Sequence, residues 1–216
     1  MREDTRHEML RRAILEGHLD GETDGDVRQY LVPLPNADVA NVDVVQASTL
    51  SRKDIRWLWP GHIPFGALTL MIGDPGLGKS QLTLDLAARV TQGAKWPDGS
   101  QAEVGNVLLL SSEDSLERTV IPRLEASGAD LERVSFLNMI LRGGKRQMFN
   151  LKTDLAELED TISKRYIDMV VIDPLNGYLG NTNSWSESEV RGVLGPACHM
   201  ADVHDVALVG VVHLNK

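Results

Sequence analysis

The segment Leu68–Ser80 constrains the fold of this chain more than any other stretch. An apolar run, Leu68–Ile72, predicts a buried strand. The run Gly73–Ser80 (Gly-Asp-Pro-Gly-Leu-Gly-Lys-Ser) then has the residue types and spacing of a phosphate-binding loop. Apolar residues recur at helical spacing between 82 and 90. Strand, glycine loop and helix therefore follow one another in the order that this pattern needs.

The chemistry of phosphate binding explains the residue types in this loop. Glycines let the backbone approach an anion closely, and successive N–H groups at a helix start form a cradle for it. Lys79 can reach the β- and γ-phosphates, and the Ser80 hydroxyl can ligate Mg²⁺. The residues expected to contact the nucleotide are Gly73, Asp74, Pro75, Gly76, Leu77, Gly78, Lys79, Ser80 and Gln81. The alternative is a glycine-rich turn that binds nothing, but Lys-Ser after the last glycine has no packing purpose.

The chain has two regions of different composition. We expect the first (1–47) to be a charged, flexible leader and the second (48–216) to be an ATP-binding domain. Between Glu16 and Asp26 the leader holds five acidic residues, three glycines and no Lys or Arg, which is typical of a solvated linker. A partner-binding arm is the alternative for this region. The second region is long enough to form one sizeable domain.

Overall composition excludes several classes of protein. The 216 residues carry a net charge of −9, which argues against a generally basic surface that coats nucleic acid. Cys198 is the only cysteine, so no intrachain disulfide can form, and a reducing compartment fits. The N-terminus lacks the apolar stretch of a signal peptide, and no apolar run is long enough to span a membrane. We expect a cytoplasmic protein with no membrane contact.

Three further strands are each expected to end in a polar residue that can serve the chemistry. Val107–Leu110 leads into Glu113, the candidate general base that polarises the attacking water. The alternative is that Ser112, Glu113 or Asp114 caps the next helix. The strand that begins at Met169 ends in Asp173, which can hold Mg²⁺ through water. Val206–Val212 leads into His213, which is either a sensor of the γ-phosphate or a structural residue.

Two other features allow two interpretations each. Trp57 and Trp59 can stack on an adenine base or pack at the edge of the domain, and packing is the commoner use of Trp. A strand predicted over Val134–Met139 is followed by the basic, glycine-containing loop Arg142–Arg146. That loop can contact the phosphates of a nucleic acid, or it is a solvated surface loop.

Taken together, these motifs resemble those of the RecA-like P-loop ATPases, and most of all the RepA-like hexameric replicative helicase group found in plasmid and phage replication modules. The similarity covers about residues 48–216. Besides the phosphate loop, it rests on Trp-Leu-Trp-Pro-Gly (57–61), Ser-Ser-Glu-Asp (111–114), Pro-Arg-Leu-Glu-Ala-Ser-Gly-Ala-Asp (122–130), Val-Ile-Asp-Pro (171–174) and Val-Val-His-Leu-Asn-Lys (211–216). The phosphate loop alone is shared by many families, but the ordered set is far more specific.

The resemblance implies an α/β RecA-like core, in which a mostly parallel sheet is flanked by helices. It implies ATP and Mg²⁺ as cofactors, a homo-oligomeric ring of hexamer type, and single-stranded DNA near its channel. By matching position, Lys79 and Ser80 bind phosphate and metal, Glu113 activates water, Asp173 supports Mg²⁺ and His213 relays the state of the γ-phosphate. Chains of this group continue past the segment that ends here at Lys216, so we expect the C-terminal part of the usual core, with its basic finger, to be absent and turnover by this chain alone to be weak.

The sequence therefore predicts a Mg²⁺-dependent ATPase of the DNA helicase type. One alternative is a module that binds ATP and assembles or regulates a larger complex without hydrolysing it. Another is a small-molecule kinase that uses the same loop. The kinase is disfavoured because no Arg-rich lid segment follows the core, and because Glu113 at a strand end suits water activation.

Overall fold

The computed structural model describes residues 44–180 and 187–214 of the chain. The chain divides after Ser51 into two units. In the first unit, the described residues contain one short 3-10 turn, η2 (Ala47–Thr49). The second unit holds the sheet and the helices that this section describes. Most of the predicted leader (1–43), and the last two residues of the Val-Val-His-Leu-Asn-Lys motif, lie outside the described residues.

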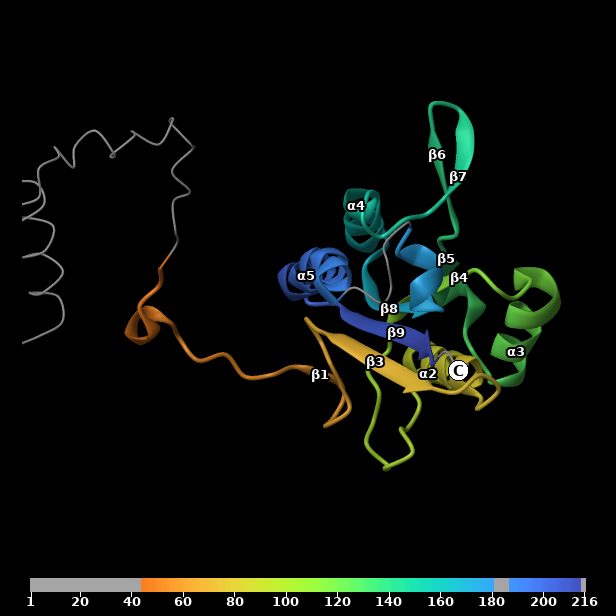
Figure 1. The fold of residues 1–216 in the computed structure, drawn as a ribbon. Coiled ribbons are helices and arrows are strands. Elements are labelled where there is room, and N and C mark those ends of the chain that lie inside the picture. The colour runs from red at the N-terminus through yellow and green to blue at the C-terminus, as the bar shows by residue number, and fades with distance from the viewer. Residues whose placement is uncertain (1–43, 181–186, 215–216) are drawn as a thin grey trace, which may run out of the picture. The chain divides into compact units, whose positions relative to one another are not determined.

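A five-stranded parallel sheet forms the centre of the second unit (Figure 1). Its strands, in spatial order, are β3 (Leu68–Gly73), β9 (Ala207–His213), β8 (Ile167–Asp173), β4 (Asn106–Ser111) and β5 (Val134–Phe136). The three central strands are nearly continuous runs of buried apolar residues, as expected where both faces of a sheet are covered. Because all five run in parallel, their carboxyl ends meet at one edge, where ligands bind in open α/β sheets. The predicted α/β architecture is confirmed.

Helices cover both faces of this sheet. They are α2 (Lys79–Gln92) and α3 (Ile121–Ala126) on one face, and α4 (Leu155–Arg165) and α5 (Glu187–His204) on the other. Neighbouring residues of β4 point to opposite faces, so that Val107 and Leu109 join the core under α2 while Leu108 and Leu110 join the core under α4 and α5. The fold thus has three layers and two apolar cores.

Glycines set both ends of α2. Gly78 (φ 81°) precedes its first residue and Gly93 (φ 60°) follows its last, and both have left-handed backbone conformations that other residues rarely adopt. Between them, Leu86 and Val90 are fully buried against the sheet. The helix is therefore fixed along its length by packing, with its N-terminus directly after the phosphate loop.

The two tryptophans of the lead-in segment belong to a small antiparallel hairpin, β1 (Trp57–Trp59) and β2 (Ile63–Pro64). The Trp59 ring stacks on Trp96, with centroids 5.0 Å apart, and its indole N–H donates to Asp98 at 2.9 Å. Both partners follow the C-terminal end of α2, whereas the phosphate loop adjoins its N-terminal end. Of the two interpretations, the structure supports packing for Trp59.

The region from 134 to 148 differs from its prediction. The strand expected over Val134–Met139 ends at Phe136, and Met139 begins a second hairpin, β6 (Met139–Arg142) and β7 (Lys145–Met148). The segment Arg142–Arg146, predicted to be a loop, is the tip of that hairpin. Gly143 (φ 57°) and Gly144 (φ 75°) supply the two positive φ angles that a two-residue hairpin turn needs. The hairpin extends away from the body of the domain (Figure 1).

The alternative given for the residues after β4, that one of them caps the next helical segment, is wrong. None of Ser112, Glu113 and Asp114 caps it. Instead, the hydroxyl of Ser115 accepts a hydrogen bond from the N–H of Arg118 and caps η3 (Leu116–Val120), a π-helical turn that leads into α3. Asp114 forms an ion pair with Arg123. The three residues before Ser115 are thus left at the strand end.

Among the described residues, no helix is long and apolar enough to cross a bilayer.

Candidate nucleotide-binding site

The phosphate loop connects the end of β3 to the start of α2. Gly76 (φ 82°) and Gly78 (φ 81°) both adopt left-handed backbone conformations. A Cβ at either position would meet no atom within 4 Å, so it is the backbone angle, and not a lack of space, that requires glycine. The loop leaves an open concavity at the positive end of the α2 dipole, which suits an anion.

The Lys79 side chain folds back over this loop. Its Nζ donates to the carbonyl oxygens of Gly73 and Asp74, at 2.7 Å each. An ammonium group held by two carbonyls can exchange them for phosphate oxygens, which offer it a full negative charge. Lys79 is therefore already placed at the mouth of the loop.

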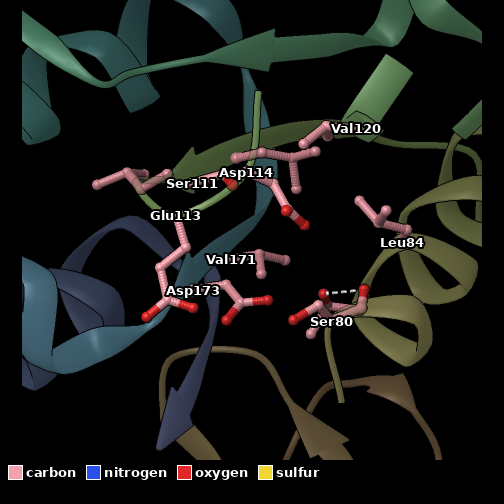
Figure 2. A pocket seen from close by; sticks show the side chains of 11 residues that line it. Ser80, Leu84, Ser111, Glu113, Asp114, Val120, Val171 and Asp173 are labelled. Atoms are coloured by element: carbon pink, nitrogen blue, oxygen red, sulfur yellow. Dashed lines mark hydrogen bonds between the residues drawn. The ribbon is translucent and has the colours of Figure 1, made fainter. Parts of the chain in front are cut away.

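Asp173 ends β8 directly opposite the loop. Figure 2 shows its carboxylate between Glu113 and Ser80 and turned toward Ser80. Burial raises the pKa of Asp173, whereas the Ser80 side chain and the charges of His213 and Lys79 counteract that rise. A hydroxyl and a carboxylate that face each other are a suitable oxygen pair for Mg²⁺.

Glu113 and His213 face each other across the same edge. Nε2 of His213 lies 3.8 Å from Oε2 of Glu113, and the Glu113 side chain is 65% exposed. His213 pairs in register with Gly73 and so lies beside the phosphate loop. Among the described residues, both of its ring nitrogens are buried without a hydrogen-bond partner. Buried polar atoms of this kind usually have a partner, so a bound ligand fits the position.

Two pockets open at this edge. One, partly open to solvent, is lined by Gly76, Gly78, Lys79, Ser80, Gln81, Arg123 and His213. The other extends between α2 and the ends of β4 and β8, and its lining includes Ser80, Glu113 and Asp173 (Figure 2). Ser80 lines both pockets, so the two adjoin at this residue. Their residues fit a nucleoside triphosphate with a divalent cation.

The structure thus brings the predicted site residues together at one edge of the sheet. Nine consecutive residues, Gly73–Gln81, form the loop and the first turn of α2, while Glu113, Asp173 and His213 come from the ends of β4, β8 and β9. Some loop side chains point outward: that of Leu77 is among the most exposed large apolar residues described. At such positions only the backbone can serve a ligand.

Sequence reasoning missed one residue of the site. Arg123 of α3 lines the pocket beside the phosphate loop and forms an ion pair with Asp114 at 3.1 Å. The only sequence signal was its place in the Pro-Arg-Leu-Glu motif, which pointed to the resemblance and not to the site. Its guanidinium adds a cation to the lining of this pocket.

The chain is similar to a known domain family and to several known proteins. Residues 33–216 match the AAA domain family. DNA repair protein RadA of Streptococcus pneumoniae is 24% identical over 184 residues, which cover 85% of this chain and 38% of that protein. RadA of Listeria monocytogenes is 30% identical over 166 residues, or 74% of this chain and 30% of that protein. DNA repair protein RAD51 homolog 2 of Arabidopsis thaliana is 29% identical over 132 residues, or 57% of this chain and 34% of that protein.

The chain spans less than two fifths of the length of these relatives. The matched region nevertheless includes the whole sheet, the phosphate loop and all four strand ends of the site. This confirms the RecA-like P-loop class that the sequence predicted. The chain belongs to the AAA domain family, and its fold is that of a RecA-like P-loop ATPase domain.

Proposed function

We propose that this chain binds ATP with Mg²⁺ at the carboxyl edge of its sheet and hydrolyses the bond between the β- and γ-phosphates. One observation carries the proposal: a lysine at the start of α2 meets two carboxylates and a histidine from the ends of three strands at one phosphate loop. Such an arrangement acts by positioning and electrostatics, with little covalent chemistry by the protein.

The phosphate-binding groups are those of the loop and α2. Lys79 exchanges its two carbonyl partners for β- and γ-phosphate oxygens, while the backbone N–H groups up to Gln81 hold the rest of the chain of phosphates. Ser80 and Asp173 would hold Mg²⁺ there. When bound, Mg²⁺ neutralises charge that develops on the phosphates. Arg123 faces the same phosphates from α3.

Glu113 is the group that activates water. In hydrolysis, a water oxygen forms a bond to the γ-phosphorus, and the bond from that phosphorus to the bridging oxygen breaks, so its electron pair leaves with ADP. The proton of the water goes to the Glu113 carboxylate. His213, 3.8 Å from that carboxylate and beside the loop, is placed to report whether a γ-phosphate is present.

The same proposal includes DNA and assembly. The curated relatives are named as DNA repair proteins, which supports a DNA-dependent ATPase, and we propose single-stranded DNA as the partner that stimulates turnover. The finer alternatives, a helicase of a plasmid or phage replication module and a ring of hexamer type, rest on the resemblance. The domain boundary near residue 48 and the cytoplasmic location stay predictions from the sequence.

The test is nucleotide binding and phosphate release by the purified chain, with and without single-stranded DNA. We expect Lys79→Ala to lose binding of a fluorescent ATP analogue. Glu113→Gln should keep binding but slow turnover by about 10²–10⁴-fold, the usual contribution of a general base. The matched controls are Lys164→Ala and Glu117→Gln. Lys164 is a lysine of α4 whose side chain is 72% exposed, and Glu117 is an exposed acid in η3, shortly after Glu113 in the chain. Neither should change either measurement.

Each outcome separates the candidate functions. Binding that survives Lys79→Ala would contradict the proposal at its first step. Binding that needs Lys79 without any turnover, whether DNA is present or not, would instead indicate the assembly or regulatory module. Turnover that transfers phosphate to a small molecule and not to water would indicate the kinase.

A further inference from the structure

A partly buried polar network supports the segment that carries Glu113. Asn138 lies between β5 and β6, and its Oδ1 accepts a hydrogen bond from the N–H of Ser111 at 3.1 Å. The same oxygen accepts one from the Tyr178 hydroxyl at 3.4 Å. Ser111 is the last residue of β4 and stands two positions before Glu113. One amide oxygen thus holds the start of the segment Ser111–Glu113, the catalytic segment, where it leaves the sheet.

Tyr178 connects the same segment to the end of β8. It is fully buried in η5 (Leu175–Tyr178), the turn that follows Asp173. Burial raises the pKa of Tyr178 to about 12 although the nearby Ser112 side chain acts to lower it, so the hydroxyl keeps its proton. The N–H of Ser112 in turn donates to the carbonyl oxygen of Asp173 at 3.4 Å. Two successive residues before Glu113 are therefore held by hydrogen bonds.

Packing leaves this network little freedom to move. A Cβ on Gly177 would lie 2.7 Å from Oγ of Ser112, so η5 rests directly against the catalytic segment. On the other side, the Phe149 ring packs on the Tyr178 ring with centroids 6.2 Å apart, and Phe149 is also buried. The N–H of Phe149 donates to the carbonyl oxygen of Asn138. The Tyr178 ring is thus held by apolar packing, and the Asn138 backbone by a hydrogen bond.

Glu113 itself has little to hold its side chain. That side chain is 65% exposed, and His213 at 3.8 Å is beyond hydrogen-bond distance. The position of its carboxylate consequently depends on the backbone that precedes it. We propose that Asn138 and Tyr178 are positioning residues that set the place of the Glu113 carboxylate for hydrolysis by holding Ser111 and Ser112. This inference rests on the proposed function, because it takes Glu113 to be the group that activates water.

Steady-state ATP hydrolysis by hydroxyl and amide variants tests the inference. We expect Asn138→Ala and Tyr178→Phe to lower kcat about 10–100-fold, since a misplacement of about 1 Å at a reacting group can slow a reaction about 10²-fold. KM for ATP should stay within about threefold, because neither residue lines the phosphate pocket. Asn138→Asp keeps an oxygen acceptor and should recover most of the lost rate. Phe149→Leu loosens the apolar packing on the Tyr178 ring without removing a polar group, so it controls for general loss of stability.

A second background distinguishes positioning from structure. With Glu113→Gln already present, Asn138→Ala should produce no further loss in single-turnover measurements, because its effect runs through the Glu113 carboxylate. Equal losses in both backgrounds, or a loss as large in Phe149→Leu, would overturn the inference. So would an unchanged kcat in Asn138→Ala when the unmodified chain is active, and in that case the proposed function stands. Absence of Lys79-dependent turnover in the unmodified chain would instead reject both.

Discussion

Asp173 is the residue at which burial and charge oppose each other most directly. Its carboxylate is partly buried at the end of β8, and this burial raises its pKa above the ordinary value of about 3.9 despite Ser80, His213 and Lys79. The folded chain without nucleotide therefore binds a proton at this group more tightly than the unfolded chain. When Asp173 is ionised, the free energy of unfolding is lower than when it is protonated. The chain therefore loses stability as pH rises from about 4 through the pKa of Asp173 in the folded state.

This sign gives a prediction for Asp173→Asn. Without nucleotide, the variant should unfold at a temperature a few degrees higher than the unmodified chain at pH 7. The difference should shrink as pH falls toward 4, where Asp173 takes up its proton. Circular-dichroism melting curves at the two pH values measure it. A variant that melts at a lower temperature than the unmodified chain at pH 7 would contradict the prediction.

The site residues that the sequence predicted share one property. Lys79, Glu113, Asp173 and His213 each follow an apolar strand or a glycine loop, so a local pattern marks them. Arg123, Asn138 and Tyr178 have no such mark. Their positions are set by contacts between segments far apart in the chain, as in the bond that joins Tyr178 to Asn138. A pattern confined to a window of residues cannot contain that information.

Among the elements, the turn η5 makes the tightest contact with the site. Gly177 has an ordinary φ angle, so the constraint at this position is one of space: a Cβ added there would lie only 2.7 Å from Oγ of Ser112. We expect Gly177→Ala to lower the free energy of unfolding by about 1–3 kcal/mol, the usual effect of overpacking. Adding Ser112→Ala removes the opposing oxygen and should restore much of that loss. Chemical denaturation measures both, and equal stabilities of the single and double variants would exclude this contact as the cause.

The hairpin β6–β7 uses its basic residues in two different ways. The Arg142 guanidinium pairs with Glu157 and with Asp154, whose side chain is 2% exposed. Lys145 and Arg146 are exposed at the tip, and neither has an ion-pair partner among the described residues. In the sequence all three form one basic cluster. Only their placement on a hairpin beside α4 separates the structural cation from the two that face solvent.

Arg142→Ala and Arg146→Ala should accordingly differ. Loss of Arg142 leaves the buried Asp154 carboxylate short of a partner and should lower the free energy of unfolding by about 1–3 kcal/mol. Loss of Arg146 should leave stability unchanged and weaken stimulation of turnover by single-stranded DNA, with the weakening largest at low salt. Thermal melting and a salt series of stimulated rates give the two readouts. If both variants behave alike, the division within the cluster is wrong.

For the molecule as a whole, the sequence predicted the class of fold and most of its elements. Apolar runs marked the four long strands of the sheet, and the order of strand, loop and helix marked the phosphate loop. The strand order β3-β9-β8-β4-β5 is a property of long-range pairing and is not contained in any one segment. The hairpin β6–β7 was missed because each strand has only four residues and lies largely exposed, and because neither the apolar run of β6 nor the polar run of β7 alternates.

The pairing of β3 with β9 affects when the domain can fold during its synthesis. Within the described part of the chain, its one neighbour in the sheet is β9, the last strand. During synthesis, β3 leaves the ribosome early, but it cannot pair until β9 and nearly all of the domain between them have been made. We expect ribosome-arrested chains of increasing length to bind a labelled nucleotide only after β9 has cleared the exit tunnel. Binding by chains that end before Ala207 would refute this, whereas its late onset would mean that no partly made copy competes for the cell's nucleotide.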